Sequence, residues 1–212
     1  DELRQKAGAD AVLRMPDIQS PLDIAALIWN KVSFYPALID EPEAIHELIF
    51  KITELLTGFL DAWFARYGTS YVTHCPGNYM EGGMCLSEDE IGVISPAMFR
   101  EFVLPSLTKL SNRYGGLSMH CCADSERQWE NLKTVPGLKL LNLCRPIESG
   151  RNGWKVFADT IALYPAPCGS GEMATWPDQY PAVVHAVLSI DGANRDEAAE
   201  KVKRMKNLLG MS

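Results

Sequence analysis

Apolar residues recur along this chain with two spacings, one typical of helices and one typical of short buried strands. Between about Glu41 and Tyr67 they stand three and four positions apart, which predicts one long helix with a single buried stripe. That stripe comprises Ile45, Leu48, Ile49, Ile52, Leu55, Leu56, Phe59, Leu60 and Trp63. Shorter helices are predicted to begin near residues that suit a first turn, namely Ser20, Ser95, Asp124, Asp178 and Asn194.

The helix that begins at Ser95 contains Pro105. Proline lacks a backbone N–H and its ring crowds the preceding turn, so Pro105 should bend this helix. The apolar residues before it have the spacing of one helix face. We expect that face to pack against a sheet through Met98, Phe99, Phe102 and Val103.

Five short apolar runs predict buried strands, at residues 11–15, 70–74, 117–120, 138–143 and 160–164. Because they alternate with helices, we expect an α/β protein with a parallel sheet. No Gly-x-Gly-x-x-Gly motif follows a strand, which argues against a dinucleotide-binding sheet. An open doubly wound sheet and a segment of a barrel both fit this pattern. Residues 1–212 contain no internal repeat or linker, so a single domain is expected.

Composition and charge narrow the classes of function. The chain has 212 residues, 47% of them hydrophobic, which is enough for a sizeable core. Its formal net charge is -7 and it has no basic block, so neither nucleic acid nor an anionic membrane is expected as a partner. No apolar run approaches the roughly 20 residues of a membrane span. Residues 1–6 lack the features of a signal peptide. We expect a cytoplasmic protein.

Reactive side chains gather where the predicted strands end. The ends of four successive strands carry His74–Cys75, His120–Cys122, Cys144–Arg145 and Cys168. In parallel α/β folds the carboxyl ends of the strands form the edge where active sites lie. A cytosolic chain with an ample core does not need disulfides, so these cysteines are expected to stay reduced. The arrangement favours metal or thiol chemistry.

His120 and Cys122 are the strongest metal-ligand candidates. Residues two apart on an extended segment point the same way, so both side chains can reach one ion. Imidazole and thiolate together favour zinc, and a third ligand, Cys144 or Cys168, would leave the fourth position open for a substrate. The remaining cysteines and histidines of interest are interpreted as packing, structural or exposed residues: Cys85, Cys121, His46 and His185.

Three charged residues are weaker candidates for a catalytic role. Arg145, at a strand end, could clamp an anion. Glu81 and Glu172, both in glycine-rich loops, could act as acids or bases. The sequence has no Gly-x-Ser-x-Gly motif, which argues against a hydrolase nucleophile elbow. It has no phosphate-binding P-loop motif either.

Four segments resemble motifs of the uroporphyrinogen decarboxylase superfamily and occur in the same order. Ile94–Pro105 (ISPAMFREFVLP) is similar to the family's I-S-P-x-x-F-x-E-F-x-x-P helix. His120–Ala123 resembles the His-x-Cys-Gly segment of the family's methyltransferases. Ser20–Ala26 resembles the family's G-P-x-T-L-A helix start, and Asp40–Leu48 resembles the D-P-E-x-x-H-E-L opening of its long helix.

The resemblance implies a TIM-type (β/α)8 barrel, of which this chain would be the C-terminal five or so βα units. Members of the superfamily are usually longer, and three strands would be missing ahead of Asp1. Five strands cannot close such a barrel, and an open sheet leaves edge groups unpaired. We therefore expect the chain to belong to a longer polypeptide, to self-associate, or to pair with a chain that supplies the missing strands.

The resemblance leaves three interpretations of function. The first is a zinc-dependent methyltransferase that moves a methyl group between a corrinoid protein and a small thiol-type acceptor, with the corrinoid carried by the partner. The second is a decarboxylase of a uroporphyrinogen-like tetrapyrrole, in which Arg145 and Arg151 would clamp carboxylates. The third is a non-catalytic barrel that binds a ligand.

The chain departs from the family pattern of the decarboxylases and from that of the zinc methyltransferases. Leu27 stands where the decarboxylases have a tyrosine, and their late Gly-His-Gly segment is absent. In the zinc methyltransferases the third ligand is a cysteine near the C-terminus, and no cysteine follows Cys168 here. The related cobalamin-independent methionine synthases take an extra metal ligand from the strand after His-x-Cys. That analogy supports Cys144 as the third ligand.

Overall fold

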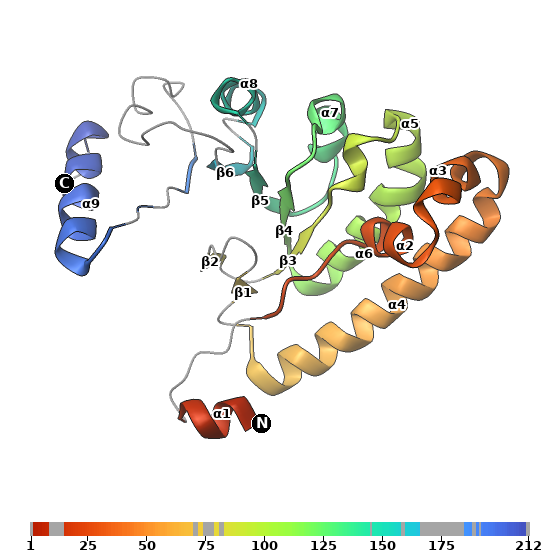
Figure 1. Cartoon of the computed structure of the whole chain (residues 1–212), viewed down its shortest axis with the longest axis horizontal. Coiled ribbons are helices and arrows are strands. Elements are labelled where there is room, and N and C mark those ends of the chain that lie inside the picture. The colour runs from red at the N-terminus through yellow and green to blue at the C-terminus, as the bar shows by residue number, and fades with distance from the viewer. Residues whose placement is uncertain are drawn as a thin grey trace.

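The structure, a computed structural model shown in Figure 1, describes residues 2–8, 15–69, 72–73, 79–80, 83–144, 146–157, 160–165, 185–187, 190 and 192–210. Its helices are α1 (Glu2–Ala7), α2 (Pro21–Ile28), α3 (Lys31–Asp40), α4 (Pro42–Tyr67), α5 (Pro96–Met98), α6 (Leu104–Tyr114), α7 (Trp129–Leu132), α8 (Ile147–Phe157) and α9 (Arg195–Leu208). Its strands are β1 (Val72–Thr73), β2 (Tyr79–Met80), β3 (Met84–Ser87), β4 (Leu117–Cys121), β5 (Leu138–Leu143) and β6 (Ala162–Pro165).

The main sheet is parallel, as the alternation of strands and helices predicts, and its strand order is β3-β4-β5-β6. Isolated parallel bridges extend it at both edges, from Gln19 to Ser87 and from Leu163 to Ala186. Strands β4 and β5 match the predicted runs at 117–120 and 138–143, and β6 lies within one or two residues of the run at 160–164. The carboxyl ends of neighbouring parallel strands therefore meet at one edge of this sheet.

Two strand predictions need correction. Of the run at 70–74, the described residues Val72 and Thr73 form the short strand β1, which pairs antiparallel with β2 in a separate two-stranded sheet. Strand β3 was missed because its four residues are all buried and show no alternation, directly after two glycines. Residues 11–14 of the first predicted strand lie outside the described residues.

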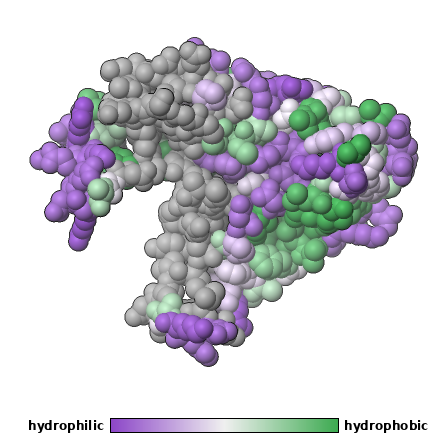
Figure 2. All heavy atoms as spheres, viewed as in Figure 1, coloured by the Kyte–Doolittle hydropathy of each residue, from purple (hydrophilic) through white to green (hydrophobic). Residues whose placement is uncertain are grey.

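The long helix α4 confirms the prediction for residues 41–67, and it lies on the right of Figure 1, beside α2 and α6. Five residues of its stripe are buried: Ile45, Ile49, Ile52, Leu56 and Leu60. The stripe is narrower than predicted, because Leu55 is 71% exposed and Phe59 is 40% exposed. Figure 2 shows apolar side chains gathered on the surface where Figure 1 draws α2 and α4. Leu27 and Ile28 of α2 are exposed.

Just before Pro105, where a bend was predicted, the helix contains a π-helical turn, Phe99–Val103, between α5 and α6. The N–H of Leu104 donates to the carbonyl of Phe99, five residues back, where an α-helix would use the carbonyl four back. Ser95 caps the start, its hydroxyl accepting the Met98 N–H at 3.2 Å. Phe99, Phe102 and Val103 are buried, which confirms the predicted packing face.

Other helices depart from expectation. Helix α3, which contains Pro36, and helix α8 were not predicted. The helix predicted from Asp124 is a 3₁₀ turn followed by the short α7. Helix α9 is confirmed, with Asn194 as its N-cap, whereas the helix predicted from Asp178 lies outside the described residues.

Within the described ranges, no single helix has the length and apolar composition needed to cross a membrane. Helices α2 and α3 meet that criterion only as a pair, and the pair is bent by 118°.

Candidate metal centre

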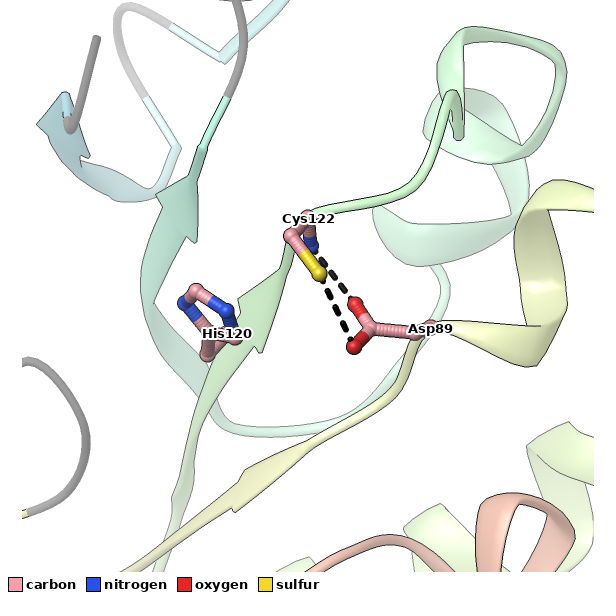
Figure 3. Close-up of side chains that lie close together, drawn as sticks. All are labelled: Asp89, His120 and Cys122. Atoms are coloured by element: carbon pink, nitrogen blue, oxygen red, sulfur yellow. Dashed lines mark hydrogen bonds between the residues drawn. The ribbon is translucent and has the colours of Figure 1, made fainter. Parts of the chain in front are cut away.

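Asp89, His120 and Cys122 converge at the carboxyl ends of strands β3 and β4 (Figure 3). One ligand atom from each, a carboxylate oxygen, an imidazole nitrogen and the thiol sulfur, lies within 4.8 Å of the other two. The thiol side is exposed, while Asp89 and His120 are partly buried. Three ligands at the carboxyl ends of two neighbouring strands, next to solvent, form a site that a metal ion can enter.

Strand β4 places His120 and Cys122 on the same side, as their spacing predicts. Cys121, between them, points the other way and is fully buried. Burial raises the pKa of the Cys121 thiol, so this sulfur stays a protonated packing group. Cys85 on β3 is also buried, which agrees with the packing role expected for both residues.

Asn142 orients the imidazole of His120. The two residues stand opposite each other in the parallel register of β4 and β5, and Nδ1 of His120 lies in hydrogen-bonding contact with Oδ1 of Asn142. Because this amide oxygen can only accept, Nδ1 carries the hydrogen, and Nε2 then carries the lone pair that binds a metal. Asn142 is buried, and such a buried partner fixes both the tautomer and the direction of the ring.

Asp89 was not among the predicted site residues. It follows strand β3, which the sequence analysis missed, so no signal marked it as a strand-end residue. Its carboxylate accepts the backbone N–H of Cys122 at 2.6 Å and the thiol of Cys122 at 3.0 Å. Partial burial, and then this neighbouring carboxylate, raise the pKa of the Cys122 thiol to about 11. Without a metal the thiol is therefore protonated at neutral pH, and its proton is the one that an ion would displace.

Two buried carboxyl groups, Asp23 of α2 and Glu88 after β3, lie behind Asp89. Asp23 accepts backbone N–H groups of Asp89 and Glu90. Glu88 is fully buried, and its carboxyl group lies against the side chains of Asp23 and Ser20. Burial, and then the negative charge of Asp23, raise the pKa of Glu88 well above its usual value.

The raised pKa of Glu88 makes stability depend on pH. A carboxyl with a raised pKa in the folded state contributes stability that is complete below its unfolded pKa, near 4.5, and declines as pH rises toward the folded value. Relative to Glu88→Gln, the wild type should lose unfolding free energy as the pH rises above about 4.5, by at most about 1.4 kcal/mol per pH unit. Urea unfolding at several pH values measures this. Glu43→Gln, an exposed change on α4, is the control, and parallel profiles for wild type and Glu88→Gln would contradict the assignment.

The other predicted site residues differ in their outcome. Cys144 is disulfide-bonded, contrary to the expectation that the cysteines stay reduced, and a sulfur in a disulfide is not a thiolate ligand. In the cluster of described residues the third place therefore belongs to Asp89. His46 lies on the exposed side of α4 beside Glu101, as expected for a surface residue. The remaining candidates lie outside the described residues: His74, Cys75, Glu81, Arg145, Cys168 and Glu172.

The donor set of the cluster fits zinc. Zinc takes nitrogen, sulfur and carboxylate oxygen at about 2.0–2.3 Å, so ligand atoms around one ion lie within about 4 Å of one another. The three ligand atoms here all lie within 4.8 Å of one another, which is close to that separation. Three protein ligands would leave a tetrahedral ion one position for a substrate, which is the arrangement of catalytic rather than structural zinc sites.

Comparisons with known proteins agree with this architecture. The uroporphyrinogen decarboxylase (URO-D) family model matches residues 3–144. A solved methyltransferase from Methanosarcina mazei superposes with a TM-score of 0.64 at 14% sequence identity, covering 98% of this chain and 62% of that one. The chain thus spans less than two thirds of the length of that structure. No curated protein matches the sequence. The family match and the parallel sheet confirm the predicted fold, a TIM-barrel type that is partial here.

Proposed function

The chain belongs to the uroporphyrinogen decarboxylase family, and on that premise we propose that it takes part in zinc-dependent methyl transfer from a corrinoid protein to a small thiol-type acceptor. The observation that carries the proposal is the convergence of Asp89, His120 and Cys122. Two of these three residues come from the segment that resembles the His-x-Cys-Gly motif of the family's methyltransferases.

In this proposal, Asp89, His120 and Cys122 hold the metal. A bound zinc ion keeps an acceptor thiol as a thiolate at neutral pH, the species that attacks a methyl group. In the transfer, a bond forms between the acceptor sulfur and the methyl carbon while the cobalt–carbon bond breaks. The electron pair of that bond stays on cobalt, and the acceptor's thiol proton leaves to solvent.

The residues of the chain set up this chemistry. Asn142 holds His120 in the tautomer that presents Nε2, and the Cys122 thiol releases its proton when a cation neutralises Asp89. The exposed side of the cluster, at Cys122, is the side from which an acceptor and a methyl donor would approach.

The charge around the cluster supports methyl transfer over decarboxylation of a tetrapyrrole. A polycarboxylate substrate needs cationic clamps, and the described residues around Asp89 are mainly acidic: Asp23, Glu88 and Glu90. Lys31, a cation close to these residues, is already paired: its Nζ lies 2.6 Å from Oε1 of Glu90. The methyltransferase from Methanosarcina mazei among the similar structures agrees in fold.

Elemental analysis combined with an activity assay tests the proposal. The purified protein should hold close to one zinc per chain, and a chelator should remove both the zinc and the transfer of methyl from methylcobalamin to a simple thiol. Restoring zinc should restore the transfer. Folded protein that takes up no zinc, or that decarboxylates uroporphyrinogen with or without it, would contradict the proposal.

A further inference from the structure

We infer that Asp23 is a positioning residue for the metal centre: its buried carboxylate, carried by helix α2, fixes the backbone that presents Asp89 to His120 and Cys122. The inference rests on the proposed metal site. It assigns a role to a residue from the first turn of a helix, about 66 positions before the ligand that it would hold.

The hydrogen bonds of the Asp23 carboxylate reach the segment that follows strand β3. Its Oδ1 accepts the N–H of Asp89 at 3.1 Å and the N–H of Glu90 at 2.9 Å. Its Oδ2 accepts the N–H of Asp89 at 2.9 Å. The residue is only 3% exposed, so water does not compete for these bonds. Hydrogen bonds from two successive N–H groups to one carboxylate fix the direction of the backbone at Asp89.

The start of α2 explains why the carboxylate turns to that segment. Ser20 caps the helix, its hydroxyl accepting the Asp23 N–H at 3.1 Å. An acid at this helix position often turns back to the N–H of the cap residue. Here the Ser20 N–H donates instead to the carbonyl of Ser87 at 2.7 Å, and the Ser87 N–H donates to Ile18 at 2.8 Å. The chain before α2 is thereby joined to the end of β3, next to Asp89.

The far side of the same segment is fixed by close packing. Asp89 leads into the 3₁₀ turn Glu90–Gly92, and a Cβ placed on Gly92 would lie 2.6 Å from the Cβ of Ala123. The turn therefore sits directly against the residue that follows Cys122. With Asp23 on one side and Ala123 on the other, the Asp89 carboxylate is held where it meets the N–H and thiol of Cys122.

A purely structural role explains Asp23 poorly. A buried carboxylate is expensive to desolvate, and Asp23 is almost completely buried. The start of α2 does not need this carboxylate, because the neutral Ser20 already caps the helix. The negative charge becomes useful if it holds a ligand of a cation, because second-shell partners of metal ligands typically change metal affinity by about 10–100-fold.

A double-mutant cycle on cobalt binding tests this inference, with Co(II) affinity read from its absorption spectrum. Asp23→Ala should weaken Co(II) binding by about 10–100-fold in the wild-type background. In the Asp89→Ala background the same change should have less than about a twofold effect, because the ligand that it positions is gone. Thr53→Ala, which removes a buried hydroxyl bonded within helix α4, controls for a general loss of stability and should leave the affinity unchanged.

An equal loss of affinity in both backgrounds would overturn the inference, because Asp23 would then act independently of Asp89. A second measurement does not depend on metal. Asp23→Ala should raise hydrogen exchange at the Asp89 and Glu90 amides by at least about tenfold, relative to the Thr53→Ala control. If the wild type binds no cobalt, the proposed function fails. Unchanged exchange at Asp89 would then reject the role of Asp23 separately.

Discussion

Replacing Cys122 with serine, or His120 with alanine, should abolish metal binding and with it methyl transfer. A protein site with several ligands binds zinc with a free energy of roughly 10 kcal/mol or more at neutral pH. Each of three ligands therefore contributes on the order of 3 kcal/mol to that binding free energy. Loss of one ligand therefore weakens binding by more than about 100-fold. Metal content after dialysis, measured against protein concentration, checks this directly.

Cys121→Ser is the matched control for these variants. Cys121 is the neighbour of both ligands, but its side chain is buried on the opposite side of β4. The variant should keep its full metal content even where it unfolds more easily. A Cys122→Ser protein that retains stoichiometric zinc would remove this thiol from the centre.

Asn142→Ala provides a graded comparison. It leaves all three ligand atoms in place but removes the acceptor that orients His120. Metal affinity should fall by about 10–100-fold, less than after removal of a ligand. The series from Cys121→Ser through Asn142→Ala to Cys122→Ser separates packing, orientation and ligation, since each step changes one of these features.

The part of the centre that the sequence predicted is the part that depends on local geometry. His120 and Cys122 belong to one strand, and the two-residue repeat of an extended chain is enough to place them together. Helix α4 was predictable because it carries a clear period within one continuous segment. Strand β5 was predictable because its mainly apolar run is six residues long, longer than β3. Zinc as the favoured metal follows from the residue types alone.

The other half of the centre depends on contacts between distant segments. Asp89 approaches Cys122 only because β3 and β4 pair in parallel, and β3 is too short and too uniformly buried to stand out. Asn142 faces His120 through the register of β4 and β5, which no single segment specifies. Asp23 depends on a third element, α2. Register and helix docking come from the tertiary structure, so residue spacing alone could not predict these three partners.

Replacing Phe99 with alanine should reduce the free energy of unfolding by about 3–5 kcal/mol. Phe99 is fully buried in the π-helical turn between α5 and α6. Truncation to alanine loses the burial of an aromatic ring and leaves a cavity that the turn cannot easily close, because Pro105 fixes the backbone just after it. Urea unfolding followed by circular dichroism measures the change.

Phe50→Ala on helix α4 is the control for this variant. Phe50 is 61% exposed, and its ring meets the ammonium of Lys109 at 5.5 Å from the ring centroid. An exposed contact of this kind contributes about 0.5–1 kcal/mol, so the control should lose no more than that. Similar losses for the two variants would mean that Phe99 does not pack into the core. Phe99→Ala changes the stability of the fold and leaves the metal ligands in place. The fraction of this variant that remains folded should therefore still bind stoichiometric zinc, unlike Cys122→Ser.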